Sequence, residues 1–265
     1  MTGESLDLTS VTVDRAFAQA LTPTDASLRT CIQCGTCSAS CPSAYAMDYS
    51  PRMLWWMIQL GLKDEVLSSR TFWVCTQCYA CTVRCPRGIV TSEAMRKLRE
   101  WAAAEGLEAP EAILRMRDAV AAQYNILGED NAGRLIWSEN LEEKPEQLAG
   151  KEGAEVLLYI GCVSAFFPMA YSIPQSLVQV LGQARVDYTT LGGEEWCCGY
   201  PLYGAGMEGQ MTELAQHNIQ RVQKLGAKTL VSTCPSCYHT WRHLYPRYVE
   251  GDYGFEILHA SEYLA

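Results

Sequence analysis

The chain has 265 residues, with 21 Lys and Arg against 30 Asp and Glu, and a formal net charge of −9. This acidic balance argues against nucleic acid as a partner. Hydrophobic residues make up 48% of the chain, enough for a buried core, and the length is typical of two domains. No apolar run approaches the roughly 18 residues of a spanning helix, so no membrane span is predicted.

The N-terminal segment, residues 1–30, reads as a polar lead-in with one short helix over Asp14–Ala20. Residues 1–20 contain acidic side chains and no apolar signal core, so export is not expected. We therefore expect a reducing, cytoplasmic compartment, with any attachment to a membrane made through a partner subunit. In that compartment, clustered cysteines are metal ligands before they are disulfides.

Eight of the 13 cysteines form two runs of the type Cys-x2-Cys-x2-Cys-x3-Cys-Pro. This spacing is typical of two [4Fe–4S] clusters, in which the fourth cysteine of each run ligates the other cluster. The predicted ligands of the first cluster are Cys31, Cys34, Cys37 and Cys85. The predicted ligands of the second cluster are Cys75, Cys78, Cys81 and Cys41. A pair of zinc sites is the alternative, but runs closed by proline suit zinc poorly.

Helices, rather than the short β-rich insert of a small bacterial ferredoxin, are expected around these runs. Ser50-Pro51-Arg52 suits a helix start, and Gly61 suits the end of that helix. Apolar residues at helical spacing predict further helices. The expected helices cover residues 53–60, 63–68, 92–104 and 110–124. Residues 1–127 are thus predicted to form an all-α ferredoxin-type domain, and the polar residues 128–153 a linker.

Beyond the linker, strand and helix signals alternate, which predicts an α/β domain with a parallel sheet over residues 154–265. The expected strands cover residues 156–160, 186–191, 229–232 and 255–258. The expected helices cover residues 173–181, 207–225 and 235–245, with a closing turn at 260–264. The fold class predicted for the whole chain is α+β, in two domains.

The remaining five cysteines, Cys162, Cys197, Cys198, Cys234 and Cys237, follow expected strands of this domain. The 34 residues between Cys162 and Cys197, and the 35 between Cys198 and Cys234, are each about one βα unit. Because ligands bind at the carboxyl edge of parallel sheets, these thiols should converge in one crevice. An unusual cluster, an ordinary cube with a free cysteine, a four-thiolate zinc site and a redox-active disulfide all remain open.

The N-terminal half resembles the C subunit of heterodisulfide reductase. The matching residues are Cys31-Ile32-Gln33-Cys34-Gly35-Thr36-Cys37, Ser50-Pro51-Arg52, Trp73-Val74-Cys75-Thr76-Gln77-Cys78-Tyr79, Cys85-Pro86 and Arg96-Lys97-Leu98-Arg99. This resemblance implies a protein that relays single electrons between a donor cluster and a catalytic partner.

The C-terminal half resembles one copy of the cysteine-rich "CCG" domain, found in the B subunit of heterodisulfide reductase and in iron–sulfur subunits of glycolate, lactate and glycerol-3-phosphate oxidoreductases. The matching residues are Gly161-Cys162, Glu195-Trp196-Cys197-Cys198-Gly199-Tyr200-Pro201, Thr233-Cys234-Pro235-Ser236-Cys237-Tyr238-His239 and His259-Ala260-Ser261-Glu262-Tyr263-Leu264. The resemblance implies that the five cysteines bind a noncubane [4Fe–4S] cluster, on which an open iron can bind a substrate sulfur.

Together the two resemblances imply an iron–sulfur subunit of a heterodisulfide-reductase-like complex. We expect electrons to pass from a partner through the two ferredoxin clusters to the five-cysteine site, where Cys197 and Cys198 are the candidates for the catalytic role in reducing a disulfide. The expected partners are other subunits of a redox complex, such as a flavoprotein, a hydrogenase, a dehydrogenase or a membrane quinone-linked subunit.

Other functions remain open because the B subunit of heterodisulfide reductase carries two CCG repeats and this chain carries one. A homodimer through the CCG domain, a second subunit, or a site that only relays electrons would each fit. A relay subunit of a quinone- or flavoprotein-linked dehydrogenase, of the hydroxyacid, glycerol-3-phosphate or succinate type, is one alternative. A structural zinc module is another.

Several side chains near the five cysteines are weaker candidates. His239 and His243 have helical ligand spacing, but thiols already meet the metal's needs, and His259 is expected to be structural. Trp196 and Tyr200 are expected to line the pocket. Glu194 and Glu195 are expected on a solvated turn rather than as proton donors.

Overall fold

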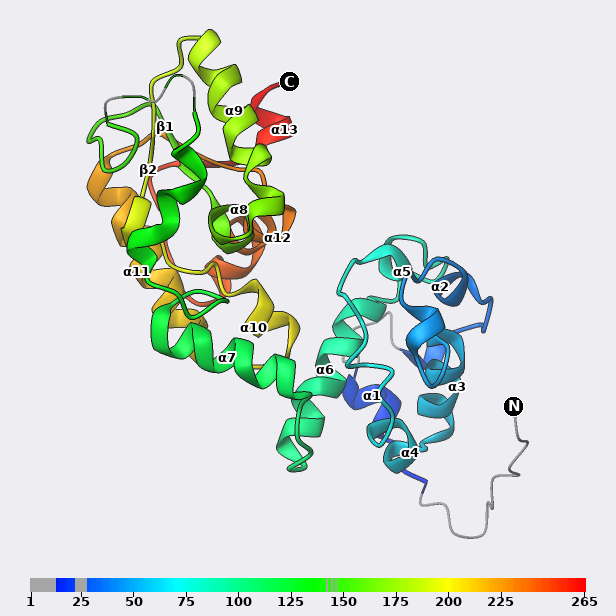
Figure 1. The fold of residues 1–265 in the computed structure, drawn as a ribbon. Helices are drawn as coiled ribbons and strands as arrows, with labels where there is room; N and C mark the ends of the chain where they lie inside the picture. The colour runs from blue at the N-terminus through cyan, green and yellow to red at the C-terminus, as the bar shows by residue number, and fades with distance from the viewer. Residues whose placement is uncertain (1–12, 22–27, 142, 144, 146) are drawn as a thin grey trace. The chain divides into compact units, whose positions relative to one another are not determined.

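The computed structural model describes residues 13–21, 28–141, 143, 145 and 147–265, and it is an α+β structure (Figure 1). The chain divides into two compact units. The N-terminal unit contains residues 1–110 with Gly204–Gly206, and the C-terminal unit contains 111–203 with 207–265. Most of the expected polar lead-in lies outside the described residues. None of the helices in the described part of the chain is long and apolar enough to cross a membrane.

The described part of the N-terminal unit is built from helices, as the sequence predicts. They are α1 (Phe17–Leu21), α2 (Thr36–Ala39), α3 (Pro51–Leu60), α4 (Lys63–Leu67), α5 (Ala80–Val83) and α6 (Thr91–Ala104). Helix α3 starts where expected, because the Ser50 side chain accepts a hydrogen bond from the Met53 amide and Pro51 occupies the first turn. It ends at Gly61, which has a left-handed φ of 79°.

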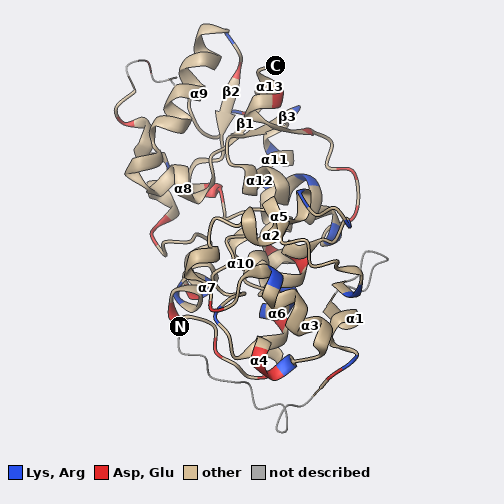
Figure 2. Ribbon diagram, turned by 90° about the vertical axis from the view of Figure 1, so that its right-hand side faces the viewer, with Lys and Arg blue, Asp and Glu red and all other residues tan. Residues whose placement is uncertain are grey.

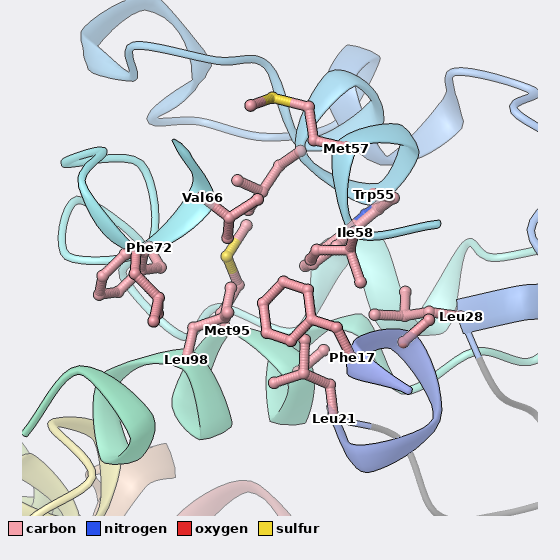
Figure 3. Close-up of a cluster of buried hydrophobic side chains, with 14 of the residues drawn as sticks. Phe17, Leu21, Leu28, Trp55, Met57, Ile58, Val66, Phe72, Met95 and Leu98 are labelled. Carbon is pink, nitrogen blue, oxygen red and sulfur yellow. The ribbon is translucent and has the colours of Figure 1, made fainter. Parts of the chain in front are cut away.

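The core of this unit lies between α1, α3 and α6 (Figure 3). Phe17 is fully buried among side chains that include Ile58 of α3 and Met95 of α6. Acidic and basic residues are interspersed along α6 (Figure 2), where Arg96 pairs with Glu93 at 3.0 Å. Met95 and Leu98 of α6 are 2% and 0% exposed, and burial of an apolar side chain of this size contributes about 1.5–3 kcal/mol to stability.

Gly61 offers a direct test of this packing. A Cβ atom at this position would lie 2.5 Å from the Asp14 carbonyl oxygen, whereas one at Gly106, also at positive φ, would meet nothing within 4 Å. We expect Gly61→Ala to lower the free energy of unfolding by about 3 kcal/mol and Gly106→Ala by about 1 kcal/mol. Anaerobic denaturant titration measures both, and equal losses would show that the close approach to Asp14 is unimportant.

The C-terminal unit contains a four-stranded parallel sheet in the order β2-β1-β3-β4. The strands are β1 (Val156–Tyr159), β2 (Tyr188–Thr190), β3 (Thr229–Ser232) and β4 (Glu256–His259). Strand β1 is buried on both faces: Leu157 and Tyr159 belong to one apolar cluster, and Val156 and Leu158 to another. An uninterrupted apolar run is what a central parallel strand requires.

Helices cover both faces of this sheet. They are α8 (Gly161–Phe166), α9 (Ser172–Gln183), α10 (Tyr200–Gly204), α11 (Met211–Leu225), α12 (Pro235–His239) and α13 (Ala260–Tyr263). Trp241 and Tyr245 pack on the face of Leu157, and α9 packs on the face of Val156. The single helix expected over 235–245 is divided into three segments. Helix α12 is followed by a π-helical turn, Thr240–Leu244, and then by a 3-10 turn, Tyr245–Arg247.

The two compact units divide after Pro110, whereas the sequence predicts a first domain over 1–127 and a linker over 128–153. Helix α7 (Glu111–Gln123) belongs to the C-terminal unit, because its Val120 is buried against Cys162, Cys197 and Leu214. Residues 128–153 are not a free linker either. They contain the 3-10 helix Asn131–Ser138, whose Trp137 is fully buried against the sheet.

Candidate functional site

The five C-terminal cysteines lie at the carboxyl edge of the sheet. Cys162 follows β1 on α8, Cys197 and Cys198 follow β2, Cys234 follows β3 and caps α12, and Cys237 lies within α12. The chain leaves central strand β1 for β2 on one side and then crosses to β3 on the other. The carboxyl ends of β1 and β3 thus flank a topological switch point, where α/β sheets bind ligands.

The five thiols form a continuous row of side-chain contacts. Cys162 contacts Cys197, Cys197 contacts Cys198, Cys198 contacts Cys237, and Cys237 contacts Cys234. All five line one cavity of about 270 Å³. Among the described residues that line it, none is Asp, Glu, Lys or Arg. A Cβ atom at Gly161 would lie 3.0 Å from the Cys237 sulfur, so glycine there keeps the backbone close to the row.

The contacts along the row shift the thiol pKa values in both directions. Hydrogen bonds from Cys197 and Cys237 lower the pKa of Cys198 to about 5. A hydrogen bond from Cys237, opposed by burial and assisted by amides at the start of α12, lowers the pKa of Cys234 to about 6. The pKa values of Cys162 and Cys237 lie well above the usual range, first because each donates to a neighbouring sulfur and then because both are buried.

A buried ion pair adjoins the row, and no sequence pattern predicts it. Arg134 and Glu195 have side chains that are each only 2% exposed, and their Nη1 and Oε1 atoms are 2.9 Å apart. The Arg134 Nη2 donates to the Cys162 sulfur at 3.3 Å. Glu195 accepts hydrogen bonds from the amides of Ile160 and Gly161. The expected solvated position of Glu195 is therefore wrong, although Glu194 is exposed as expected.

Of the two aromatic residues expected to line the cavity, only one does so. Tyr200 lines the cavity as expected, whereas Trp196 is not among its lining residues. Trp196 instead stacks between Tyr124 and His217, with both pairs of ring centroids 3.5 Å apart. The Cys197 amide donates to the carbonyl of Tyr124, the residue directly after α7, at 2.6 Å, so Tyr124 holds the backbone beside the cysteine pair.

None of the three histidine candidates is among the described residues that line the cavity. His239 and His243 contact one another with ring centroids 5.1 Å apart. His259 caps α13 through Ser261, and its Nε2 lies 3.2 Å from the Thr233 carbonyl oxygen. This capping position is the structural role expected for His259.

In the N-terminal unit, one cavity is lined by Cys31, Cys34, Cys37 and Cys85, the set predicted for the first cluster. Trp55 forms part of its wall, and the buried indole nitrogen has no hydrogen-bond partner among the described residues. An acceptor within the cavity would satisfy this donor. Four thiols, an orphaned N–H group and a small enclosed space fit an iron–sulfur cluster.

The second predicted set, Cys41, Cys75, Cys78 and Cys81, also comes together. Burial raises the pKa of Cys41, and the nearby charges of Cys81 and Cys78 raise it further. Burial likewise raises the pKa of Cys75, to which the charges of Cys81 and Cys41 add. Arg99, which is 5% exposed, donates to the carbonyl oxygens of Phe72 and Cys75. Although burial raises the pKa of Cys75, the nearby charge of Arg99 offsets part of this rise.

The two runs share a local geometry that the sequence only partly reveals. Gln33 donates to the Cys31 sulfur at 3.5 Å, and Gln77 donates to the Cys75 sulfur at 3.7 Å. Both glutamines have positive φ, at 57° and 54°. The next turn is left-handed at Gly35 in the first run and at Tyr79 in the second. Each run therefore curls so that an amide side chain faces its first thiol.

A zinc site requires several ligands around one point. Within the described ranges, no group of three or more His, Cys, Asp and Glu side chains is arranged to hold a single metal ion. All 13 cysteines are free thiols. Metal analysis separates zinc from iron directly and is part of the experiment proposed below.

Two domain families match the chain. Residues 27–89 match the 4Fe-4S dicluster domain, and residues 138–242 match the cysteine-rich domain named CCG. The first match includes all eight N-terminal cysteines, from Cys31 to Cys85. The second includes all five cysteines of the row together with strands β1, β2 and β3.

Several known proteins are similar to this chain. The D subunit of dihydromethanophenazine:CoB–CoM heterodisulfide reductase from Methanosarcina barkeri is 26% identical over 263 residues. The EtfAB:quinone oxidoreductase of Syntrophomonas wolfei is 33% identical over 218 residues, which are 78% of this chain and 29% of that protein. The iron–sulfur C subunit of CoB–CoM heterodisulfide reductase from Methanopyrus kandleri is 46% identical over 80 residues, 30% of this chain and 42% of that protein.

The match to the Methanosarcina barkeri protein covers 90% of this chain, which in turn spans 62% of the length of that relative. The sequence identity therefore extends across both units, and the relative contains further sequence that this chain does not match. The chain thus contains a 4Fe-4S dicluster domain followed by a CCG cysteine-rich domain, and it is similar to the D and C subunits of heterodisulfide reductase.

Proposed function

We propose that this protein is the iron–sulfur electron-transfer subunit of a heterodisulfide-reductase-like complex and that its five-cysteine cavity reduces a disulfide. The observation that carries the proposal is the row of five contacting thiols at the switch point of the sheet. Five thiols in one cavity exceed the four ligands of an ordinary cube or of a zinc site.

Each of the three groups of cysteines described above is proposed to hold one cluster. Cys31, Cys34, Cys37 and Cys85 would hold one [4Fe–4S] cluster, and Cys75, Cys78, Cys81 and Cys41 a second. The noncubane cluster would use the row, Cys162, Cys197, Cys198, Cys234 and Cys237. When bound, these groups supply reduction potentials that the surrounding hydrogen bonds and charges adjust.

The residues that line the five-cysteine cavity suit a sulfur-containing substrate. Val163 and Ile173 line the cavity and are each about half exposed, which places an apolar mouth at its edge. Cys197 and Cys198, the proposed catalytic pair, are 1% and 4% exposed and lie in the middle of the row. Burial of this pair excludes water from the disulfide bond that is to be cleaved. Because no Asp, Glu, Lys or Arg is among the described lining residues, the cavity suits a disulfide that has no charged group near its sulfurs.

The proposed partner is a flavoprotein, hydrogenase, dehydrogenase or quinone-linked subunit that donates electrons, because relatives of this chain are named as subunits of heterodisulfide reductases. A relay role in a quinone-linked complex is the second candidate. It is favoured by the match to the EtfAB:quinone oxidoreductase. A flavin-containing subunit that co-purifies, together with no disulfide reductase activity, would select this second candidate.

The experiment that tests the proposal is anaerobic quantitation of iron, sulfide and zinc, paired with EPR spectroscopy of reduced protein and of thiol-treated, oxidised protein. Three clusters require about 12 irons per chain, and substrate binding at the third predicts a new EPR signal after thiol treatment. About eight irons and one zinc would instead make the C-terminal unit a structural module.

A further inference from the structure

The buried pair Arg134–Glu195 has no role in the function proposed above. Three edges of the Arg134 guanidinium are occupied: Nε donates to Asn131 at 2.9 Å, Nη1 to Glu195 at 2.9 Å, and Nη2 to the Cys162 sulfur at 3.3 Å. Its carbon also lies 5.2 Å from the ring centroid of Phe166. Because all three of these edges are hydrogen-bonded, the buried guanidinium is held in one orientation, with its positive charge beside the Cys162 sulfur.

The two members of the pair face different groups. Glu195 directs both oxygens to N–H donors, namely the amides of Ile160 and Gly161 and the guanidinium. Arg134 alone reaches a sulfur of the row. The positive charge is therefore nearest to the thiol, and the negative charge is screened from it by three donors.

We infer that Arg134 is a positioning residue that raises the reduction potential of the five-cysteine site, and that Glu195 limits this effect. The inference rests on the proposed function, since it needs an iron–sulfur cluster in the row. A hydrogen bond and a positive charge at a thiolate ligand withdraw electron density from the metal and stabilise the reduced form. Burial strengthens both effects, because the effective dielectric constant is low.

The test is an anaerobic redox titration of the third cluster, followed by EPR spectroscopy, in variants that change one charge at a time. Arg134→Met is expected to make reduction at least tenfold less favourable, which is a shift of about 59 mV to lower potential for one electron. Glu195→Gln is expected to shift the potential upward, because it leaves the arginine charge uncompensated. Arg134→Lys keeps the charge and is expected to remain nearer to the wild-type potential than Arg134→Met.

A matched control lies one residue away. Arg221 pairs with Glu194 at 3.0 Å, and both side chains are exposed, at 39% and 60%. Arg221→Met and Glu194→Gln make the same charge changes in solvent, so both are expected to leave the potential unchanged. The clusters of the N-terminal unit give an internal reference in every titration.

Opposite shifts for Arg134→Met and Glu195→Gln support the inference, because a purely structural role would disturb the site in the same sense. Shifts of one sign, or none, in variants that keep the third cluster overturn it. If Arg134→Met loses the iron of this cluster, Glu195→Gln decides: an upward shift of the potential supports the inference, and a downward shift or none overturns it. A wild-type protein that holds zinc in the row overturns the proposed function itself and is recognised before any variant is made.

Discussion

Substitution of Cys198 by serine is expected to reduce the iron content from about 12 to about eight atoms per chain and to abolish the EPR signal of the third cluster. Cys198 is the central sulfur of the row, in contact with Cys197 on one side and Cys237 on the other, and it is 4% exposed. No other sulfur can replace it without moving a strand end. The signals of the two clusters in the N-terminal unit should persist unchanged.

Ser164→Ala is the matched control for this variant. Ser164 lines the same cavity and is 5% exposed, but it carries no sulfur. It should therefore retain about 12 irons. Survival of all three clusters in the Cys198→Ser protein would show that this thiol is not a ligand, and loss of iron in both variants would point to a general failure of folding.

The second large effect concerns the crossed ligation of the two N-terminal clusters. Replacing Cys37 and Cys85 together by alanine is expected to remove one cluster completely and to leave the other intact, because both thiols line the same cavity. The protein should lose about four irons and keep one full [4Fe–4S] signal from this unit. Iron quantitation and EPR spectroscopy of the reduced protein measure the two results.

The comparison pair is Cys37→Ala with Cys41→Ala, two residues of the same run. If the fourth cysteine crosses to the other cluster, this second protein removes one ligand from each of two clusters and damages both. If each run instead holds its own cluster, the results are exchanged: the Cys37 and Cys85 variant damages both clusters, and the Cys37 and Cys41 variant removes only one.

Much of the fold follows from local signals in the sequence. Ser50, Pro51 and Gly61 determine the ends of α3 through a side-chain cap, a restricted φ and a left-handed turn, all of which act within a few residues. The uninterrupted apolar run of β1 predicts a central parallel strand, and β1 is paired on both sides. Cysteine spacing places the five thiols after strands because one βα unit has a nearly fixed length.

The features that the sequence does not predict share a physical cause. An amphipathic pattern in α7 shows that one face is buried but not which core covers it, and Val120 packs against Cys162 and Cys197 rather than on the N-terminal helices. Arg134 and Glu195 are 61 residues apart, and each alone has the character of a surface charge. A buried ion pair becomes recognisable only when both partners are placed, since either charge alone would be unstable in the interior.

The separation of the row in sequence also has a consequence for how the protein is made. Its sulfurs come from the ends of three parallel strands, which meet only after the crossovers between them have folded. Parallel pairing of this kind depends on distant contacts and forms late. In the proposed function, insertion of metal into the C-terminal unit follows or accompanies formation of the sheet, so cofactor assembly there would report on completed folding during biogenesis.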